Sequence, residues 1–246
     1  MRRFGALLVA AITSSTAAHA AHPFISEDPG TQGTGRFELE MGFAARQGDP
    51  TIPGRSAIVS PQLSIGARED LDLIALGAWV DQSVAQGPAV VGNGDTALDF
   101  KWRFYERGSL AFAVRAGLDL PTGDSNTGLG AGQLGGHVIA IVSVTLGAFA
   151  VYGNADYAYT RAPGTRSNLG GFSVALTRPD DKPIQTFIEV AAFSNPDPSN
   201  PQWPAVARTG AIYTVNDWMD VDAGFQARLN RSAARAAYLL GATVRW

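Results

Sequence analysis

The chain lacks cysteine altogether and has only three histidines among its 246 residues. Without cysteine there are no disulfide crosslinks and no thiolate metal sites. Beyond residue 20 only His22 and His137 remain, which leaves little for histidine-based catalysis or metal binding. We therefore predict no catalytic residues, no metal site and no cofactor, and we do not expect an enzyme.

Charge is also scarce, since 17% of the residues are charged and 46% are hydrophobic. The formal net charge of -3 becomes -5 once Arg2 and Arg3 are removed with a leader. This acidic balance argues against nucleic-acid binding. The low charge content is unusual for a soluble secreted protein, whose surface needs many charged groups.

Long hydrophobic runs are missing except at the start of the chain. Arg2 and Arg3 precede a short apolar core, Phe4 to Ile12, and Ala18-His19-Ala20 fits a small-residue cleavage site. We predict that residues 1–20 are a signal peptide, because the run is too short to span a bilayer. No later run approaches about 18 apolar residues, so no transmembrane helix is expected. The rest of the chain is long enough for one large domain.

Strict alternation of apolar and polar residues dominates the remainder. In "WMDVDAGFQARL" (218–229), Met219, Val221 and Phe225 share one face, while Asp220 and Asp222 share the other. Successive side chains of a strand point to opposite faces, so this segment has one apolar and one charged face. The same reading places Ile74 and Leu76 on an inner face. Twelve strands are predicted, at 35–46, 56–68, 70–82, 94–106, 109–120, 136–146, 148–160, 168–178, 183–194, 205–215, 218–229 and 234–246.

The connections between these strands alternate between long and tight, apart from a short final loop at 230–233. An even number of strands with this alternation is typical of outer-membrane barrels. We therefore predict an all-β fold, a transmembrane antiparallel up-and-down β-barrel of about 12 strands over residues 35–246, with both termini periplasmic. The alternative is a soluble secreted sandwich or barrel, which would show the same alternation around an apolar core.

The last strand favours the membrane barrel. It alternates to the final residue in "AYLLGATVRW", and Tyr238, Leu240, Val244 and Trp246 are predicted to form the signal read by the outer-membrane assembly machinery. Aromatic residues gather at predicted strand ends, as in the girdles that meet outer-membrane lipid. They are Phe104, Phe149, Tyr213, Trp218 and Trp246 at the periplasmic side and Trp79, Tyr157 and Tyr159 at the external side.

One motif suggests different chemistry. "GLGAGQLGG" (128–136) contains a literal GxGxxG, which in dinucleotide-binding proteins lies between a strand and a helix. Here "HVIAIVSVTLGAFAVYG" follows, which has β-branched residues and no helical stripe. We interpret the motif as a flexible loop between two strands, part of the longest external loop at 121–135.

Charged residues on the polar faces are the candidate pore lining. They are Glu38, Glu40, Arg68, Asp95, Asp99, Lys101, Arg103, Arg115, Asp119, Glu189, Arg208, Asp220, Asp222, Arg228 and Arg245. Rings of one sign would select ions, whereas mixed signs can pair across a narrow interior and close it. Residues 21–34 are predicted to form a periplasmic or lumen-plugging segment.

Four segments resemble a known family: "HPFISEDPGTQGTGRFELE" (22–40), "GDTALDFKWRFYE" (94–106), "LPTGDSNTGLGAG" (120–132) and the closing strand. They are similar to the bacterial outer-membrane β-barrels of the phenol-degradation meta-pathway, or transporter-like, family. The resemblance implies an outer-membrane channel or transporter associated with aromatic-compound catabolism. It implies no catalytic residues.

We expect passive passage of a small solute through the bacterial outer membrane, with aromatic or hydrophobic compounds as the candidate solutes. A non-conducting structural or adhesive barrel is one alternative. A lipid-modifying barrel enzyme is another, because His137 begins a strand near the external rim and Ser143 follows in the same strand.

Overall fold

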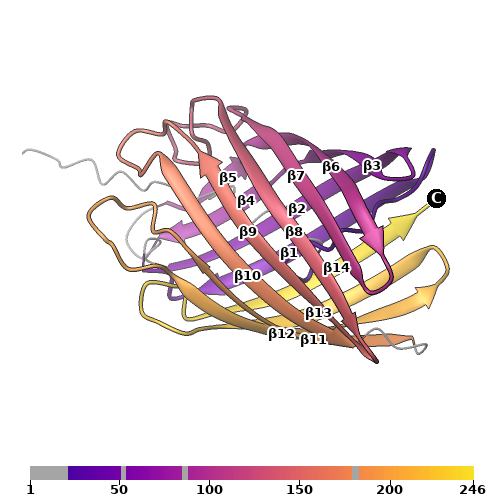
Figure 1. The fold of residues 1–246 in the computed structure, drawn as a ribbon. Helices are drawn as coiled ribbons and strands as arrows, with labels where there is room; N and C mark the ends of the chain where they lie inside the picture. Colours follow the sequence, from indigo (N-terminus) through magenta and orange to yellow (C-terminus); the bar gives the residue numbers. More distant parts are fainter. Residues whose placement is uncertain (1–21, 51–53, 85–87, 179–182) are drawn as a thin grey trace, which may run out of the picture.

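The computed structural model describes residues 22–50, 54–84, 88–178 and 183–246, and these residues form a barrel of antiparallel strands (Figure 1). The predicted signal peptide lies outside the described residues, as do residues 179–182, which separate the strands predicted at 168–178 and 183–194. The strand segments are β1 (Phe37–Gln47), β2 (Gly54–Arg68), β3 (Leu71–Leu76), β4 (Trp79–Val84), β5 (Val90–Asn93), β6 (Thr96–Arg107), β7 (Leu110–Leu120), β8 (Gly135–Leu146), β9 (Phe149–Tyr159), β10 (Asn168–Arg178), β11 (Ile184–Phe193), β12 (Ala205–Asn216), β13 (Met219–Arg228) and β14 (Ala236–Arg245).

The sheet closes on itself because β1 pairs with both β2 and β14. The fourteen segments occupy twelve positions around the wall, since β2 pairs with β3 along one half and with β4 along the other. In the same way β6 pairs with β3 while β5 pairs with β4. The predicted all-β, twelve-stranded antiparallel barrel is confirmed.

The single strand predicted at 70–82 is wrong in detail, because it is interrupted after Leu76. Opposite the interruption lies Pro61 of β2, whose carbonyl accepts a hydrogen bond from Gly77 N at 3.0 Å. Proline has no N–H to return to the neighbouring strand, so the regular ladder cannot continue there. The strand predicted at 94–106 correspondingly has an additional segment, β5, before it.

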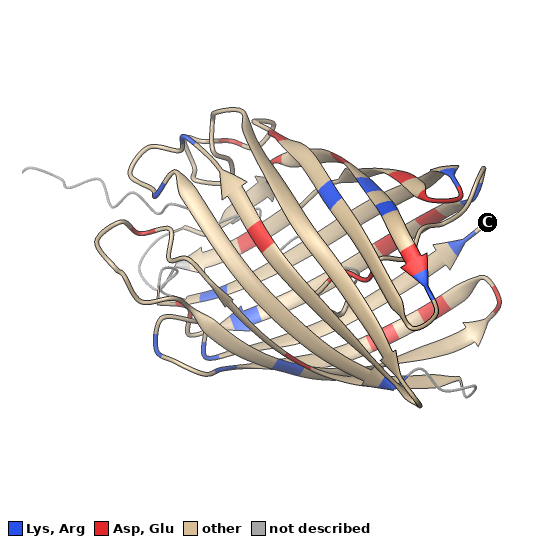
Figure 2. Ribbon diagram, viewed as in Figure 1, with Lys and Arg blue, Asp and Glu red and all other residues tan. Residues whose placement is uncertain are grey.

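The two faces of the wall follow the predicted alternation. Phe172 and Ile188 on the outer face are 61% and 58% exposed, and the strands nearest the viewer carry few charged positions along their length (Figure 2). The predicted girdle aromatics Trp79, Tyr157 and Trp218 are also exposed. A soluble monomer rarely exposes so continuous an apolar surface, whereas a barrel in lipid requires one. Among the described residues, no helix is long and apolar enough to span a membrane.

Connections at one end of the barrel are long and those at the other, beside the C-terminus, are tight (Figure 1). The longest connection joins β7 to β8 at 121–134, as the sequence predicts. Gly108 and Gly147 form tight turns with φ of 59° and 61°, a backbone conformation that glycine adopts without steric cost.

Replacing Trp246 with alanine should reduce the amount of folded barrel. Trp246 stacks on Phe37 of β1 with ring centroids 5.7 Å apart, so it joins the two strands that close the sheet. Loss of the pair should cost about 1 kcal/mol of unfolding free energy. Heat-modifiable protein in outer-membrane fractions and urea unfolding in lipid vesicles measure both effects. Trp218→Ala, at an exposed aromatic outside the last strand, is the control, and equal losses in the two variants would contradict the assembly-signal prediction.

Candidate functional site: the barrel interior

Residues 22–34 run around the inside of the wall before β1 begins. The path starts at His22, whose Nδ1 lies 2.6 Å from Asp222 of β13 and whose backbone N donates to Glu40 of β1 at 3.0 Å. The imidazole ring rests on Gly42 and Gly241, which face each other across β1 and β14. A β-carbon at either glycine would lie about 2.5 Å or less from this ring, so both positions leave space for His22.

The next residues cross the wall formed by β9 to β12. The Pro23 carbonyl accepts a hydrogen bond from Arg208 at 2.8 Å, and the backbone N atoms of Ile25 and Ser26 donate to Glu189 at 2.8 and 2.6 Å. Both oxygens of Glu189 are thus used by backbone donors. These contacts fix the direction of the segment across this part of the wall.

Phe24 occupies an apolar cage between these polar contacts. Its ring lies 4.2 Å from the Phe187 ring and 6.1 Å from the Tyr152 ring, the latter edge-on. Ala175 completes the buried cluster and Ile212 packs against it. The interior is therefore not uniformly polar, because β9 to β12 contribute an aromatic-lined patch that accepts one ring.

Glu27 lies at the centre of a buried charge cluster on the opposite wall. Its carboxylate pairs with Arg115 of β7 and, at 3.4 Å, with Lys101 of β6. Arg115 also donates to Asp99 at 2.7 Å and to Gln62 at 3.1 Å. The side chains of Arg115 and Glu27 are 0% and 1% exposed. Buried charges are tolerated only when paired and hydrogen-bonded, so the segment and the wall depend on each other here.

The end of the segment is bound to β1, β2 and β3. Gln32 N donates to Asp72 at 3.1 Å, and its side-chain amide donates to Glu38 at 2.7 Å. Hydrogen bonds from Thr34 hold the pKa of Glu69, in the turn after β2, below its ordinary value. Gly66 passes so close to the Gly33 carbonyl that no side chain could be placed on its α-carbon.

The candidate pore-lining residues fall into three groups. Those with buried side chains in the interior are Glu38, Glu40, Asp99, Lys101, Arg115, Glu189, Arg208 and Asp222. Those that are half-buried are Asp95, Arg103, Asp119 and Asp220. Those that are exposed at the strand ends are Arg68, Arg228 and Arg245. Positive and negative groups are interleaved, so the interior has paired charges instead of a ring of one sign.

Several interior residues were not in the predicted set, and simple signals would have found most of them. Asp72 has the same parity as Ile74 and Leu76, which were already placed on the inner face. Asn154 and Asp156 likewise share a face of β9. Glu27 has no such signal, because the irregular segment that carries it has no period.

Asp95 has a different role from the other candidates. It lies between β5 and β6, and its carboxylate accepts hydrogen bonds from Gly123 N at 2.9 Å and Ala131 N at 2.7 Å. These bonds fold the 121–134 loop back onto the wall, where Leu129 is buried above Gly92. The glycine-rich motif thus lies in the connection between β7 and β8, as expected if the GxGxxG sequence is a loop between two strands.

His137 is inward-facing and lies far from Ser143, the serine that the enzyme alternative places in the same strand. Its ring nitrogens lie 3.2 Å from Asp119 and 3.2 Å from Asp99. Ser143 is six residues along the same strand, which places the two side chains roughly 20 Å apart. Within the described ranges, no group of three or more His, Cys, Asp or Glu could hold a metal ion.

Solved outer-membrane proteins share this fold. An outer-membrane channel from Pseudomonas putida F1 aligns with a TM-score of 0.72 and 14% identity, over 89% of this chain and 98% of that one. The NanC porin aligns at 0.62 with 7% identity, over 84% and 98%. The CymD monoaromatic hydrocarbon channel aligns at 0.50 with 10% identity, over 87% and 88%. No protein-family model matches the sequence, and no curated protein does. The chain therefore has the fold of outer-membrane channels.

Arg115→Ala should destabilise the barrel by about 3–5 kcal/mol, because it leaves Glu27 and Asp99 as buried carboxylates without their shared partner. Arg245→Ala is the matched control. Arg245 also pairs with two carboxylates, but its side chain is 42% exposed, so its loss should cost about 0–1 kcal/mol. Urea unfolding in lipid vesicles compares the two, and equal costs would contradict the cluster's importance.

Asp95→Ala should release the 121–134 loop. Two backbone N–H groups lose a charged acceptor worth about 1.5–3 kcal/mol, so exchange of the Gly123 and Ala131 amides should quicken by about tenfold or more. Hydrogen-exchange NMR measures this rate. Asp124→Ala is the control, because the Asp124 carboxylate accepts hydrogen bonds within its own turn, from Asn126 and Thr127. The same acceleration in that variant would show that Asp95 does not hold the loop.

Proposed function

We propose that this protein is a channel of the bacterial outer membrane through which small solutes pass passively. The observation that carries the proposal is a closed barrel with an apolar exterior and a polar interior. Lipid requires the first property, and a water-accessible pathway requires the second. The likeness in fold to outer-membrane channels supports the same conclusion.

The segment at 21–34 is proposed to plug the lumen, so that the structure represents a closed channel. Its described residues are held by Glu40, Glu189 and Arg208 of the wall and by the pairing of Glu27 with Arg115. These anchors are hydrogen bonds and ion pairs, which can be exchanged for water. Opening would then be a displacement of the segment, with the barrel wall unchanged.

The solute is proposed to be a small aromatic or hydrophobic compound. The Phe24 cage supports this, because a wall that accepts a phenyl ring from the segment offers the same surface to a ring in transit once the segment moves. The resemblance to the phenol-degradation meta-pathway family points the same way. The charged candidate residues would line the other side of the path.

The bacterial outer membrane is the location proposed for the channel. Residues 1–20 are proposed as the export signal, and Tyr238, Leu240, Val244 and Trp246 as the signal for the assembly machinery. With the tight turns periplasmic, the C-terminus lies in the periplasm, the segment after the export signal enters the lumen and the 121–134 loop faces outward. The proposed partners are outer-membrane lipid and a small-molecule solute, with no nucleic acid.

Glu27→Ala should increase conductance in planar bilayers. Removing the carboxylate breaks the pairing of the segment with Arg115 and Lys101 while Arg115 keeps Asp99. A loss of about 2–3 kcal/mol of anchoring would raise the open fraction by about thirty- to more than a hundredfold. Asp28→Ala is the matched control, since the Asp28 carboxylate accepts a hydrogen bond from nearby Gly30 N.

Absence of current from folded Glu27→Ala protein would favour a non-conducting structural barrel. Swelling of vesicles in benzoate, compared with an aliphatic carboxylate of equal charge, tests the solute class separately. Lipid processing that disappears in His137→Ala would instead support the enzyme alternative.

A further inference from the structure

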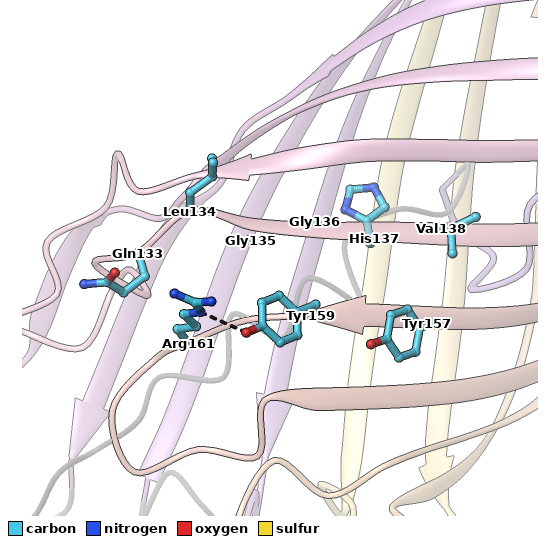
Figure 3. A pocket seen from close by; sticks show the side chains of 9 residues that line it. All are labelled: Gln133, Leu134, Gly135, Gly136, His137, Val138, Tyr157, Tyr159 and Arg161. Carbon is cyan, nitrogen blue, oxygen red and sulfur yellow. Dashed lines mark hydrogen bonds between the residues drawn. The ribbon is translucent and has the colours of Figure 1, made fainter.

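A groove opens on the outer wall at the end of the barrel where the long loops lie (Figure 3). Its volume is about 600 Å³. The lining residues come from the end of the 121–134 loop, the start of β8 and the end of β9. They are Gln133, Leu134, Gly135, Gly136, His137, Val138, Tyr157, Tyr159 and Arg161.

The groove is apolar along most of its length. Leu134 and Val138 are exposed on one side and Tyr157 and Tyr159 on the other. Between them Gly136 pairs with Tyr159, and having no side chain it leaves bare backbone as the floor. A β-carbon at Gly136 would lie 3.3 Å from the Gly117 carbonyl oxygen, which is a tight contact, so a larger residue here would crowd the floor of the groove. This shape matches an extended hydrocarbon chain lying along the wall.

A positive charge lies at the loop end of the groove. The Arg161 guanidinium donates to the Tyr159 hydroxyl at 2.8 Å and lies 5.7 Å from the centre of its ring (Figure 3). This hydrogen bond is donated by Nε and holds the Arg161 side chain in place. The two terminal amino groups of the guanidinium are not used in this bond. Gln133 supplies an amide at the same end. Such an arrangement suits a phosphate, which accepts several hydrogen bonds from one guanidinium.

The geometry points to a binding site for a lipid with a phosphorylated head group, whose acyl chain lies over Gly136 and whose phosphate contacts Arg161. Charge complementarity and position favour this occupant. In the orientation proposed above, on which this inference rests, the groove faces the membrane at its interface with the external side, and phosphorylated glycolipid forms the outer leaflet of bacterial outer membranes.

A solute leaving the lumen sideways fits the groove less well. Directly behind the floor, His137 is engaged by Asp119 and Asp99 on the inner face. The backbone of β8 is also paired on both sides here, with Gly117 to Asp119 of β7 and with Ala158 and Tyr159 of β9. An apolar molecule would have to pass a paired polar cluster and a continuous ladder.

Binding of purified lipid A to delipidated, refolded protein in detergent, followed by native mass spectrometry, tests the proposal. Wild-type protein should retain one lipid A molecule. Gly136→Leu, which fills the floor, should abolish the complex, whereas Gly153→Leu on the outer face of β9 beyond the groove should not. Gly136→Ala should give an intermediate loss, and heat modifiability on gels verifies that each variant is folded.

The head-group contact is tested with Arg161→Gln, which should weaken lipid A binding up to about fivefold, as expected for one exposed ion pair. It should leave diacylglycerol binding unchanged. Arg231→Gln, an exposed arginine outside the groove, is the control. Equal lipid binding by Gly136→Leu and Gly153→Leu would overturn the proposal. Equal effects of the two arginine variants on lipid A binding would also overturn it. The same holds if inorganic phosphate alone blocks lipid A binding, or if toluene displaces the lipid from the wild-type protein.

Discussion

The pairing of Glu27 with Arg115 is the interaction on which the interior depends. Arg115 is fully buried in the wall and is shared by Asp99 and Glu27, while Lys101 approaches the same carboxylate. Each of these charges loses its hydration, which is acceptable only because every one has an opposite partner within reach. Without the segment, Arg115 and Lys101 would each lose a carboxylate partner, and the segment without the wall would have an unpaired carboxylate. The conformation of residues 22–34 is therefore fixed by charge balance as much as by shape.

The order of residues in the segment follows the chemistry of the wall. Phe24 lies where β10 and β11 supply apolar side chains, and Glu27 lies where β6 and β7 supply cations. Backbone donors between them meet Glu189. An irregular segment has no hydrogen-bonded ladder of its own to satisfy its backbone N–H groups. The inward-facing carboxylates of the barrel accept these hydrogen bonds instead. The polar inner faces of the strands therefore bind the N-terminal segment, and the same groups would contact a solute.

The barrel was predictable from sequence because successive side chains of a strand point to opposite faces. Once one apolar residue is assigned to the lipid-facing side, the side of every other residue in that strand follows. Departures come from local chemistry that periodicity does not describe. Pro61 interrupts the neighbouring strand, and a bulge between Arg103 and Tyr105 leaves both Phe104 and Tyr105 exposed. The role of Glu27 was not predictable, since its partners are about 70 to 90 residues away and nothing local marks it. The alternation of side chains along a strand predicts that Asp95 and Asp99 share the inner face. The break between β5 and β6 instead turns Asp95 toward the 121–134 loop.

The route of the N-terminal segment sets an order of events in assembly. Its partners include Asp72 of β3 and Asp222 of β13, and these strands share one interior only after β1 has paired with β14. Most contacts of His22 to Gln32 therefore have no complete counterpart in a partly inserted sheet. Until closure the inward charges must be solvated by water, so the nascent barrel is hydrated inside. The first described residues of the chain are then the last to reach their contacts.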